Sequence, residues 1–157
     1  MSGQRHHSAC ADALVTLVDT ETELAFSSLL ELELIEACYQ VALRERWGTR
    51  WKQRRPDGRA RARVARLAET AIGAWTQIVD VANATRVEAT LVSGAVPDLM
   101  RTYALGSYDA VHVATANHLS IETLLTLDTG FARVPPTHLT IHTATAKIPR
   151  MRTLRAS

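Results

Sequence analysis

The sequence predicts a single α/β domain built around a mainly parallel sheet. The chain has 157 residues, which is enough for one domain with a buried core. Short apolar stretches suited to strands alternate with longer segments rich in leucine, alanine and glutamate, which are suited to helices. Because parallel strands need a crossover connection, usually a helix, this alternation favours a parallel sheet with helices on its faces.

The first half of the chain is predicted to be mostly helical. Residues 9–18 read as a short helix, residues 24–28 as a brief strand, and residues 29–46 as a long helix without glycine or proline. A loop is expected over residues 47–58, because it ends in the turn-forming sequence Pro-Asp-Gly. A second helix is predicted from residue 59 to about residue 75.

The second half contains most of the expected strands. The predicted elements, in order, are a strand at 77–81, a helix at 84–93, helices starting near 97 and at 107, and strands at 124–127 and 138–142. Residues 1–148 are assigned to one domain. Residues 149–157 are expected to form a basic, flexible tail.

The composition excludes several classes of protein. No apolar run approaches the roughly 20 residues that a membrane span needs, so no membrane association is expected. The amino-terminal residues lack the apolar core of a signal peptide. Cys10 and Cys38 are isolated and do not have the spacing of zinc ligands, which favours a reduced, cytoplasmic protein.

Charge is distributed unevenly along the chain. The formal net charge is +2, but residues 44–66 carry ten lysines and arginines against two acids. The remaining residues therefore include eight basic and fourteen acidic side chains. A basic insertion on an acidic domain indicates an interaction surface rather than a requirement of the fold.

Aromatic residues lie within this basic insertion. Trp47 and Trp51 are interleaved with four basic side chains, which are Arg50, Lys52, Arg54 and Arg55. Such a mixture suits single-stranded RNA, because phosphates pair with the charges and bases stack on the rings. The alternative is a solvated surface loop that a tryptophan anchors to the core.

Two aspartates lie where chemistry is expected in an α/β sheet. Asp109 is in the first turn of the helix that starts at Ser107, and Asp128 follows the strand at 124–127. Ligand sites in open α/β sheets lie outside the carboxyl ends of the strands, and clustered carboxylates bind hard divalent ions. Each residue also has a structural explanation, since Asp109 suits a helix start and Asp128 suits a turn.

Glu33 and His112 are further candidates. Glu33 falls beside the apolar stripe of its helix, where a charge is costly to bury unless it is paired or bound to a metal. It can equally be a solvated residue on a helix with other glutamates. His112 lies one turn after Asp109 and could transfer protons, or it could be a core histidine with a satisfied hydrogen bond.

Three motifs together resemble the PIN-domain ribonucleases, and more narrowly the VapC-type toxins of toxin–antitoxin pairs. The motifs are FSSLLELEL at residues 26–34, YDAVHVATA at 108–116 and LLTLDTGF at 124–131. The second and third form a fairly specific pairing at the right separation, whereas the first is looser. The resemblance covers roughly residues 9–142, and the basic insertion is longer than is usual in the family.

The resemblance implies a fold, a reaction and partners. The fold would be a PIN-like α/β/α sandwich, and Glu33, Asp109 and Asp128 would be the catalytic acids that bind Mg²⁺ or Mn²⁺. The metal ion would lower the pKa of a water molecule that attacks an RNA phosphodiester. The expected partners are an RNA substrate, a cognate antitoxin and a second subunit in a homodimer.

The chain departs from the family at its start. Family members begin with a strand that ends in an aspartate, and this sequence starts too late to contain that strand. Asp19, in the sequence Val-Asp-Thr, imitates the motif but lies only fourteen residues before Glu33, which leaves no room for the intervening helices. Either the true start lies upstream, or the protein is a degenerate member of the family.

Three functional hypotheses follow from these observations. The first is a metal-dependent endoribonuclease of the toxin type. The second is a catalytically impaired PIN-like domain that acts as an RNA- or protein-binding module, because the first acidic residue of the family is missing. The third is a small α/β protein whose acids only cap helices and form turns.

Overall fold

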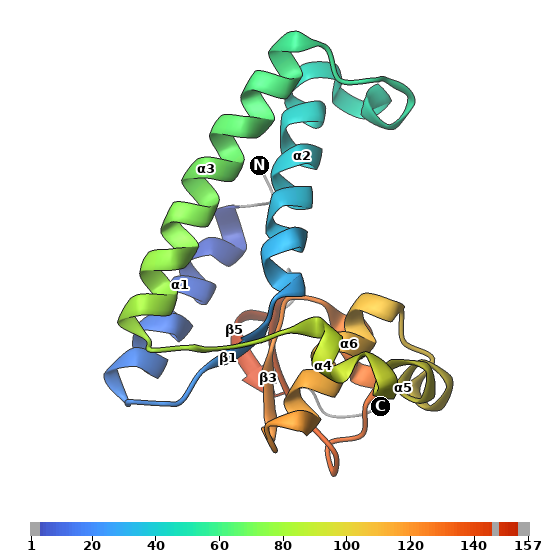
Figure 1. Cartoon of the computed structure of the whole chain (residues 1–157). Helices are drawn as coiled ribbons and strands as arrows, with labels where there is room; N and C mark the ends of the chain where they lie inside the picture. Colours follow the sequence, from blue (N-terminus) through green and yellow to red (C-terminus); the bar gives the residue numbers. More distant parts are fainter. Residues whose placement is uncertain (1–3, 146–147, 154–157) are drawn as a thin grey trace.

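The computed structural model describes the backbone of residues 4–145 and 148–153 and the side chains of residues 11–143 (Figure 1). Its helices are α1 (Gln4–Asp19), α2 (Leu29–Trp47), α3 (Gly58–Val81), α4 (Ala89–Val92), α5 (Val96–Tyr103) and α6 (Ser107–His118). Its strands are β1 (Ala25–Ser27), β2 (Thr85–Val87), β3 (Thr123–Leu125), β4 (Thr140–Thr145) and β5 (Ile148–Thr153). Short 3₁₀ helices are η1 (Gly48–Gln53), η2 (Ser93–Ala95) and η3 (Thr129–Arg133).

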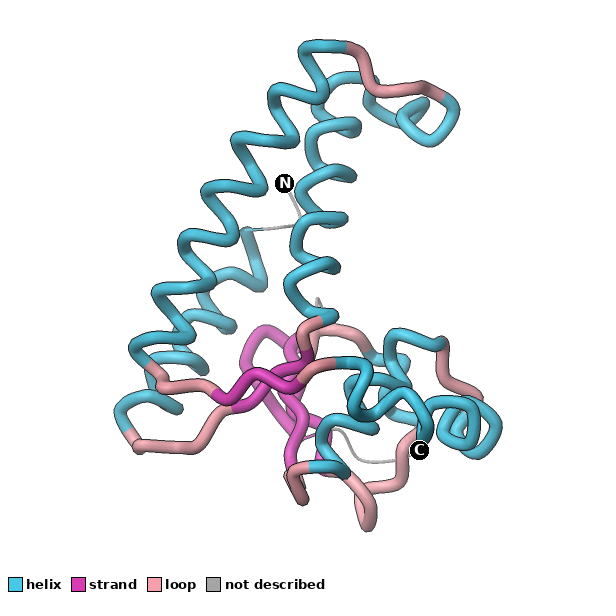
Figure 2. Tube along the Cα trace, viewed as in Figure 1, coloured by secondary structure: helices cyan, strands magenta, loops and turns pink. Residues whose placement is uncertain are grey.

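The described strands form two separate groups (Figure 2). Strands β1 and β2 make one parallel pair. Strand β3 pairs in parallel with β4, and β4 pairs in antiparallel fashion with β5. The prediction of a mainly parallel sheet is therefore confirmed, although the described sheet is divided between β1 and β3.

Neighbouring residues of β1 show that helices cover both faces. The ring of Phe26 packs edge-on against Trp75 of α3, with centroids 5.0 Å apart. The next residue, Ser27, contacts His112 of α6 through its hydroxyl group. Because successive side chains of a strand point to opposite faces, α3 and α6 lie on opposite sides of β1. This arrangement confirms the predicted α/β/α sandwich.

Helices α2 and α3 form a long antiparallel hairpin that extends away from the strands (Figure 1). Asp57 starts α3 as its N-cap, since its carboxylate accepts a hydrogen bond of 2.8 Å from the Ala60 amide. The same carboxylate pairs with Arg46 near the end of α2. These contacts hold the tip of the hairpin together, where the basic insertion lies.

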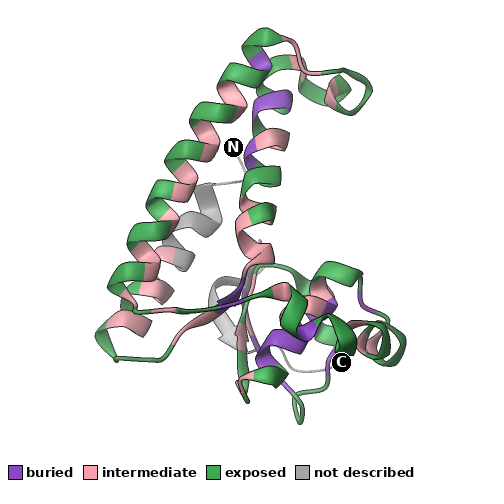
Figure 3. Ribbon diagram, in the orientation of Figure 1, coloured by how far each residue is buried: buried purple, intermediate pink, exposed green. Residues whose placement is uncertain are grey.

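The main core lies around α6 rather than in the hairpin (Figure 3). Ala110 and Val113 of α6 are fully buried, and they pack with Phe131, Leu139 and Ile141 in one apolar cluster. The hairpin buries much less of its surface, as the green and pink residues of Figure 3 show. Helix α6 is thus a rigid support for the residues at its first turn.

One predicted strand and one predicted helix were wrong. Residues 77–81, predicted as a strand, form the last turns of α3. The strand lies instead at Thr85–Val87, inside the region predicted as a helix at 84–93, of which only α4 and η2 remain helical. Pairing with β1 explains the difference, because the Thr85 amide donates to the Leu24 carbonyl at 2.8 Å.

Two smaller predictions also need correction. The loop expected at 47–58 contains the 3₁₀ helix η1. Residues 149–153 of the expected tail belong to β5, and residues 154–157 lie outside the described part of the chain. None of the described helices combines the length and the apolar character needed to cross a membrane.

Candidate active site at the ends of strands β1 and β3

The three acids predicted from the sequence line one cavity of about 270 Å³. Glu33 comes from the second turn of α2, Asp109 from the first turn of α6, and Asp128 from the segment that follows β3. The cavity also contains His112 and Thr126. Glu33 and Asp109 are 76 positions apart in the sequence, and Asp109 and Asp128 are 19 positions apart. The three residues nevertheless meet at the carboxyl ends of β1 and β3, where α/β folds place their sites.

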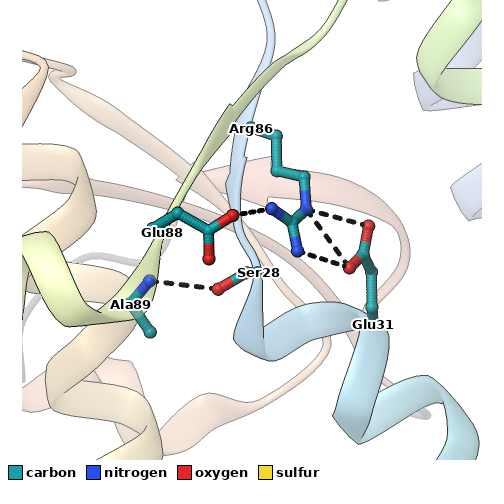
Figure 4. A network of polar contacts seen from close by, with 5 residues as sticks. All are labelled: Ser28, Glu31, Arg86, Glu88 and Ala89. Carbon is teal, nitrogen blue, oxygen red and sulfur yellow. Dashed lines mark hydrogen bonds and ion pairs between the residues drawn. The ribbon is translucent and has the colours of Figure 1, made fainter.

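A polar network fixes the start of α2, and with it the position of Glu33 (Figure 4). Arg86, the middle residue of β2, pairs with both Glu31 in the first turn of α2 and Glu88. Ser28, the residue before α2, accepts a hydrogen bond of 3.0 Å from the Ala89 amide. The network joins the starts of α2 and α4, so the first turn of α2 has a defined place beside the cavity.

Glu33 does not face solvent freely. The Glu33 carboxylate (Oε2) lies 2.9 Å from His112 Nε2, and His112 Nδ1 lies 3.2 Å from the Ser27 hydroxyl. The His112 side chain is only 17% exposed. His112 therefore links β1, α2 and α6. These contacts agree with the second interpretation of His112 from the sequence, a histidine whose hydrogen bonds are satisfied.

Asp109 shows that the acids affect one another electrostatically. Burial raises the pKa of the Asp109 carboxyl above its ordinary value, and the nearby Asp128 raises it further. His112 acts in the opposite direction, Glu33 again raises the pKa, and a hydrogen bond from the Gly106 main chain lowers it. A carboxyl whose pKa is raised by two other carboxylates lies in a concentration of negative charge.

Asp128 is held by a tight turn at the end of β3. Its carboxylate accepts a hydrogen bond of 2.7 Å from the Gly130 amide, and its own amide donates to the Thr126 hydroxyl at 3.0 Å. A Cβ atom at position 130 would lie 3.1 Å from Asp128 Oδ1, so the turn leaves little space for a side chain there. Among the described side chains, the second oxygen of this carboxylate makes no hydrogen bond.

The donor chemistry of the cavity suits a hard divalent cation. Three carboxylates supply only oxygen ligands, which Mg²⁺ and Mn²⁺ prefer, and a cation would relieve the repulsion that raises the pKa of Asp109. In the described part of the chain, however, no group of three such side chains converges closely enough to hold an ion. The Glu33 carboxylate is instead hydrogen-bonded to His112.

The basic residues lie apart from the acids, at the tip of the hairpin. Arg44 and Lys52 lie over the ring of Trp51, at 5.1 Å and 5.6 Å from its centroid. Within residues 11–143, the side chains of Arg54 and Arg55 make no hydrogen bond or ion pair and are exposed. From Glu33, the tip lies fourteen residues along α2, which is about 20 Å at 1.5 Å per residue.

Sequence reasoning missed two residues that support side chains of the cavity. Ser27 and Thr126 support His112 and Asp128, and small hydroxyl residues in strands gave no signal of that role. Asp19 was not assigned to the site, and it lines a different, apolar cavity between α1 and α3.

The acid-lined cavity lies at the strand ends of an α/β/α sandwich, which is where open α/β folds place their sites. Comparison with protein families gives a match to the PIN domain over residues 1–135, and the chain belongs to this family. Proteins of the family are in general nucleases that depend on divalent metal ions and act on RNA. Comparisons with curated proteins and with solved structures gave no match.

Proposed function

We propose that the protein is an endoribonuclease that requires Mg²⁺ or Mn²⁺ and serves as the toxin of a toxin–antitoxin pair in the cytoplasm. The main support is the cavity in which Glu33, Asp109 and Asp128 meet from three separate elements. The raised pKa of Asp109 supports the same assignment: burial is its main cause, and Asp128 and Glu33 raise it further through negative charge that a cation would offset. The toxin role rests on the three motifs that resemble VapC-type toxins.

The residues of the cavity have distinct roles in this proposal. Glu33, Asp109 and Asp128 bind the metal ion, which supplies charge for the scissile phosphate and lowers the pKa of a water molecule. Thr126 and the Gly130 amide hold Asp128 in position. For Glu33 to bind a metal ion, its hydrogen bond to His112 has to loosen or share the carboxylate.

The decisive experiment compares RNA cleavage by two aspartate variants in the presence of Mn²⁺. Asp109→Asn keeps the size of the side chain but removes its charge, and cleavage should fall by more than about 100-fold, since groups that only support metal ligands already cost 10–100-fold. Asp98→Asn is the matched control, because Asp98 also lies in the first turn of a helix but is 81% exposed. Equal cleavage by both variants would contradict the proposal.

The second candidate function is an RNA- or protein-binding module without nuclease activity. It is favoured by the lack of a convergent metal cluster in the described residues and by the contact between Glu33 and His112. RNA binding that is unchanged by EDTA, together with no cleavage at millimolar Mn²⁺, is the expected result for this function. Cleavage that the Asp109→Asn variant lacks would rule it out.

A further inference from the structure

A second cavity lies beside the acid cavity, between α2 and the start of α6. It has a volume of about 690 Å³ and is lined by residues of α2 together with Tyr108 from the first turn of α6. Glu33 lines both cavities, so the two are adjacent. The volume falls within the range of about 300–1,000 Å³ that is common for pockets that bind small ligands.

The lining of the second cavity combines an aromatic ring with polar side chains. Tyr108 is 60% exposed, so most of its surface is accessible to a ligand. Leu29 and Leu32 supply apolar surface, and Glu36 and Gln40 supply hydrogen-bonding groups. Surfaces that bind single-stranded RNA use this combination, because a base stacks on the ring while polar side chains hydrogen-bond its edge.

Hydrogen bonds along α2 orient the polar side chains of this cavity. The Gln40 amide donates from Nε2 to Glu36 Oε1 at 3.2 Å, and Gln40 Oε1 accepts a hydrogen bond of 3.2 Å from Arg44 Nη2. Because these three residues are four positions apart, they form a row on one face of the helix. Among the described residues, Glu36 Oε2 makes no hydrogen bond. An ionised carboxylate only accepts hydrogen bonds, so Glu36 offers the cavity acceptors for a ligand that carries donors.

We propose that this cavity binds one guanine base of a single-stranded RNA substrate. The base stacks on Tyr108, and the Glu36 carboxylate accepts hydrogen bonds from N1–H and from the N2 amino group of guanine. This inference rests on the proposed function, because it takes RNA as the ligand of the adjacent acid cavity, and it adds a base preference to that function.

The chemistry of the base edges favours guanine over the other bases. Guanine presents two adjacent donors on its Watson–Crick edge, and these match the two oxygens of a carboxylate. Adenine and cytosine place a ring-nitrogen acceptor beside their amino group, and uracil places carbonyl oxygens beside its N3–H. A carboxylate repels these acceptors, so the other three bases each gain at most one hydrogen bond from Glu36.

The same row of side chains leads from the cavity to the basic tip of the hairpin. Arg44, at the far end of the row, lies over the ring of Trp51 at 5.1 Å from its centroid. An RNA strand with one base on Tyr108 can therefore follow α2 toward the tip, where phosphates meet positive charge and further bases can stack. The positive charge of Arg44 also offsets part of the repulsion between Glu36 and the phosphates.

The experiment measures the binding of short fluorescent RNAs in buffer with EDTA, so that no metal-dependent cleavage takes place. The probes are oligouridines that carry one central guanosine, inosine or adenosine. The guanosine RNA should bind about tenfold or more tightly than the adenosine RNA, because hydrogen bonds to a charged group are strong. Inosine lacks only the N2 amino group and should give an intermediate affinity. Equal affinity for the three RNAs overturns the proposal.

Protein variants identify the side chains that read the base. Glu36→Gln keeps the size of the side chain and should remove the preference for guanosine, whereas Glu69→Gln, at an exposed position of α3 outside the cavity, should keep it. Tyr108→Ala should weaken binding by about tenfold, and Tyr108→Phe should restore it, because stacking needs only the ring. An unchanged preference in Glu36→Gln, or unchanged affinity in Tyr108→Ala, overturns the proposal.

Cleavage of the same RNAs in Mn²⁺ separates this inference from the proposed nuclease function. A guanosine preference in binding without any cleavage supports the base pocket and contradicts the nuclease. Cleavage without a guanosine preference in binding leaves the nuclease function intact and overturns the base pocket. A change in the oligomeric state of Tyr108→Ala, measured by light scattering, would assign the cavity to a contact between copies of the chain and would also overturn it.

Discussion

At the scale of single residues, the position that we propose for Asp109 in the site carries an energetic cost. Burial and the neighbouring Asp128 raise the pKa of its carboxyl above the ordinary value of 3.8. Between the unfolded and folded pKa values the folded protein binds more protons, so ionisation of Asp109 at neutral pH lowers the free energy of unfolding. A site that holds repelling charges in this way gives up stability until a cation binds.

This cost can be measured in the metal-free protein. Replacement of Asp109 with asparagine should raise the free energy of unfolding relative to the wild type at neutral pH. The difference should shrink as the pH falls through the raised pKa of Asp109, and it should be smallest below the ordinary value of 3.8. Urea denaturation in EDTA across this range provides the test. A difference that stays constant with pH would show that charge is not its origin.

The three acids could be predicted from the sequence, whereas their supporting contacts could not. Glu33, Asp109 and Asp128 lie in motifs whose local structure, helix starts and a strand end, is visible in the sequence. The hydrogen bond between His112 and Glu33 joins residues 79 positions apart. Which side chain fills the space between two helices depends on their packing, and that packing leaves no local pattern.

At the scale of elements, the α2–α3 hairpin depends on a small number of buried side chains. Leu43 of α2 is only 2% exposed, whereas Leu32 on the same helix is 63% exposed. Ala60 of α3 is also buried, with 1% exposure. The apolar contact is therefore concentrated toward the tip of the hairpin, and the lower part of α2 leaves apolar side chains in water.

Two leucine variants should show how much each of these regions contributes to the free energy of unfolding. Leu43→Ala should lower the free energy of unfolding by about 2–5 kcal/mol, because it removes buried methyl groups and leaves a cavity. Leu32→Ala, the matched control on the same helix, should change it by less than about 0.5 kcal/mol. Chemical denaturation monitored by circular dichroism measures both. Comparable losses in the two variants would indicate that a partner or a second copy covers Leu32.

Element boundaries were predicted well where one local signal dominated. Helix α2 starts and ends within a residue of its prediction, because no glycine or proline interrupts it before Gly48. The strand β2 was misplaced because the β-branched run at 77–81 resembles a strand more than Thr85–Val87 does. Residues 85–87 form the strand because they pair with β1, which lies sixty residues earlier in the chain. Local strand propensity does not contain information about such a distant pairing.

At the scale of the whole molecule, the acid cavity and the basic tip lie at opposite ends of α2. The separation of about 20 Å corresponds to about six nucleotides of a helical strand at 3.4 Å each. An RNA that contacts both regions must therefore extend along the hairpin. The tip would act on affinity for longer substrates, while the acids would act on the bond that is cut.

Charge reversal at two places on the hairpin tests this arrangement. The double variant Arg54→Glu and Arg55→Glu should weaken RNA binding by about tenfold and reduce the salt dependence by about 0.7 for each lost phosphate contact. Arg61→Glu and Arg66→Glu make the same change in net charge at exposed positions in the first turns of α3, outside the loop that carries Trp51, and should have a smaller effect. Filter binding over a range of salt concentrations measures both. Identical losses would mean that only net charge matters.

The exposed hairpin also has a consequence for how the molecule opens. Its shaft buries few apolar side chains, whereas α6 lies in the centre of the main cluster. Segments with little buried surface open locally at a lower free energy than the global transition, while buried segments exchange only when the whole domain unfolds. The shaft of the hairpin can thus open and close locally while α6, which carries Asp109 and His112, stays folded, so among the three acids only Glu33 on α2 takes part in this motion.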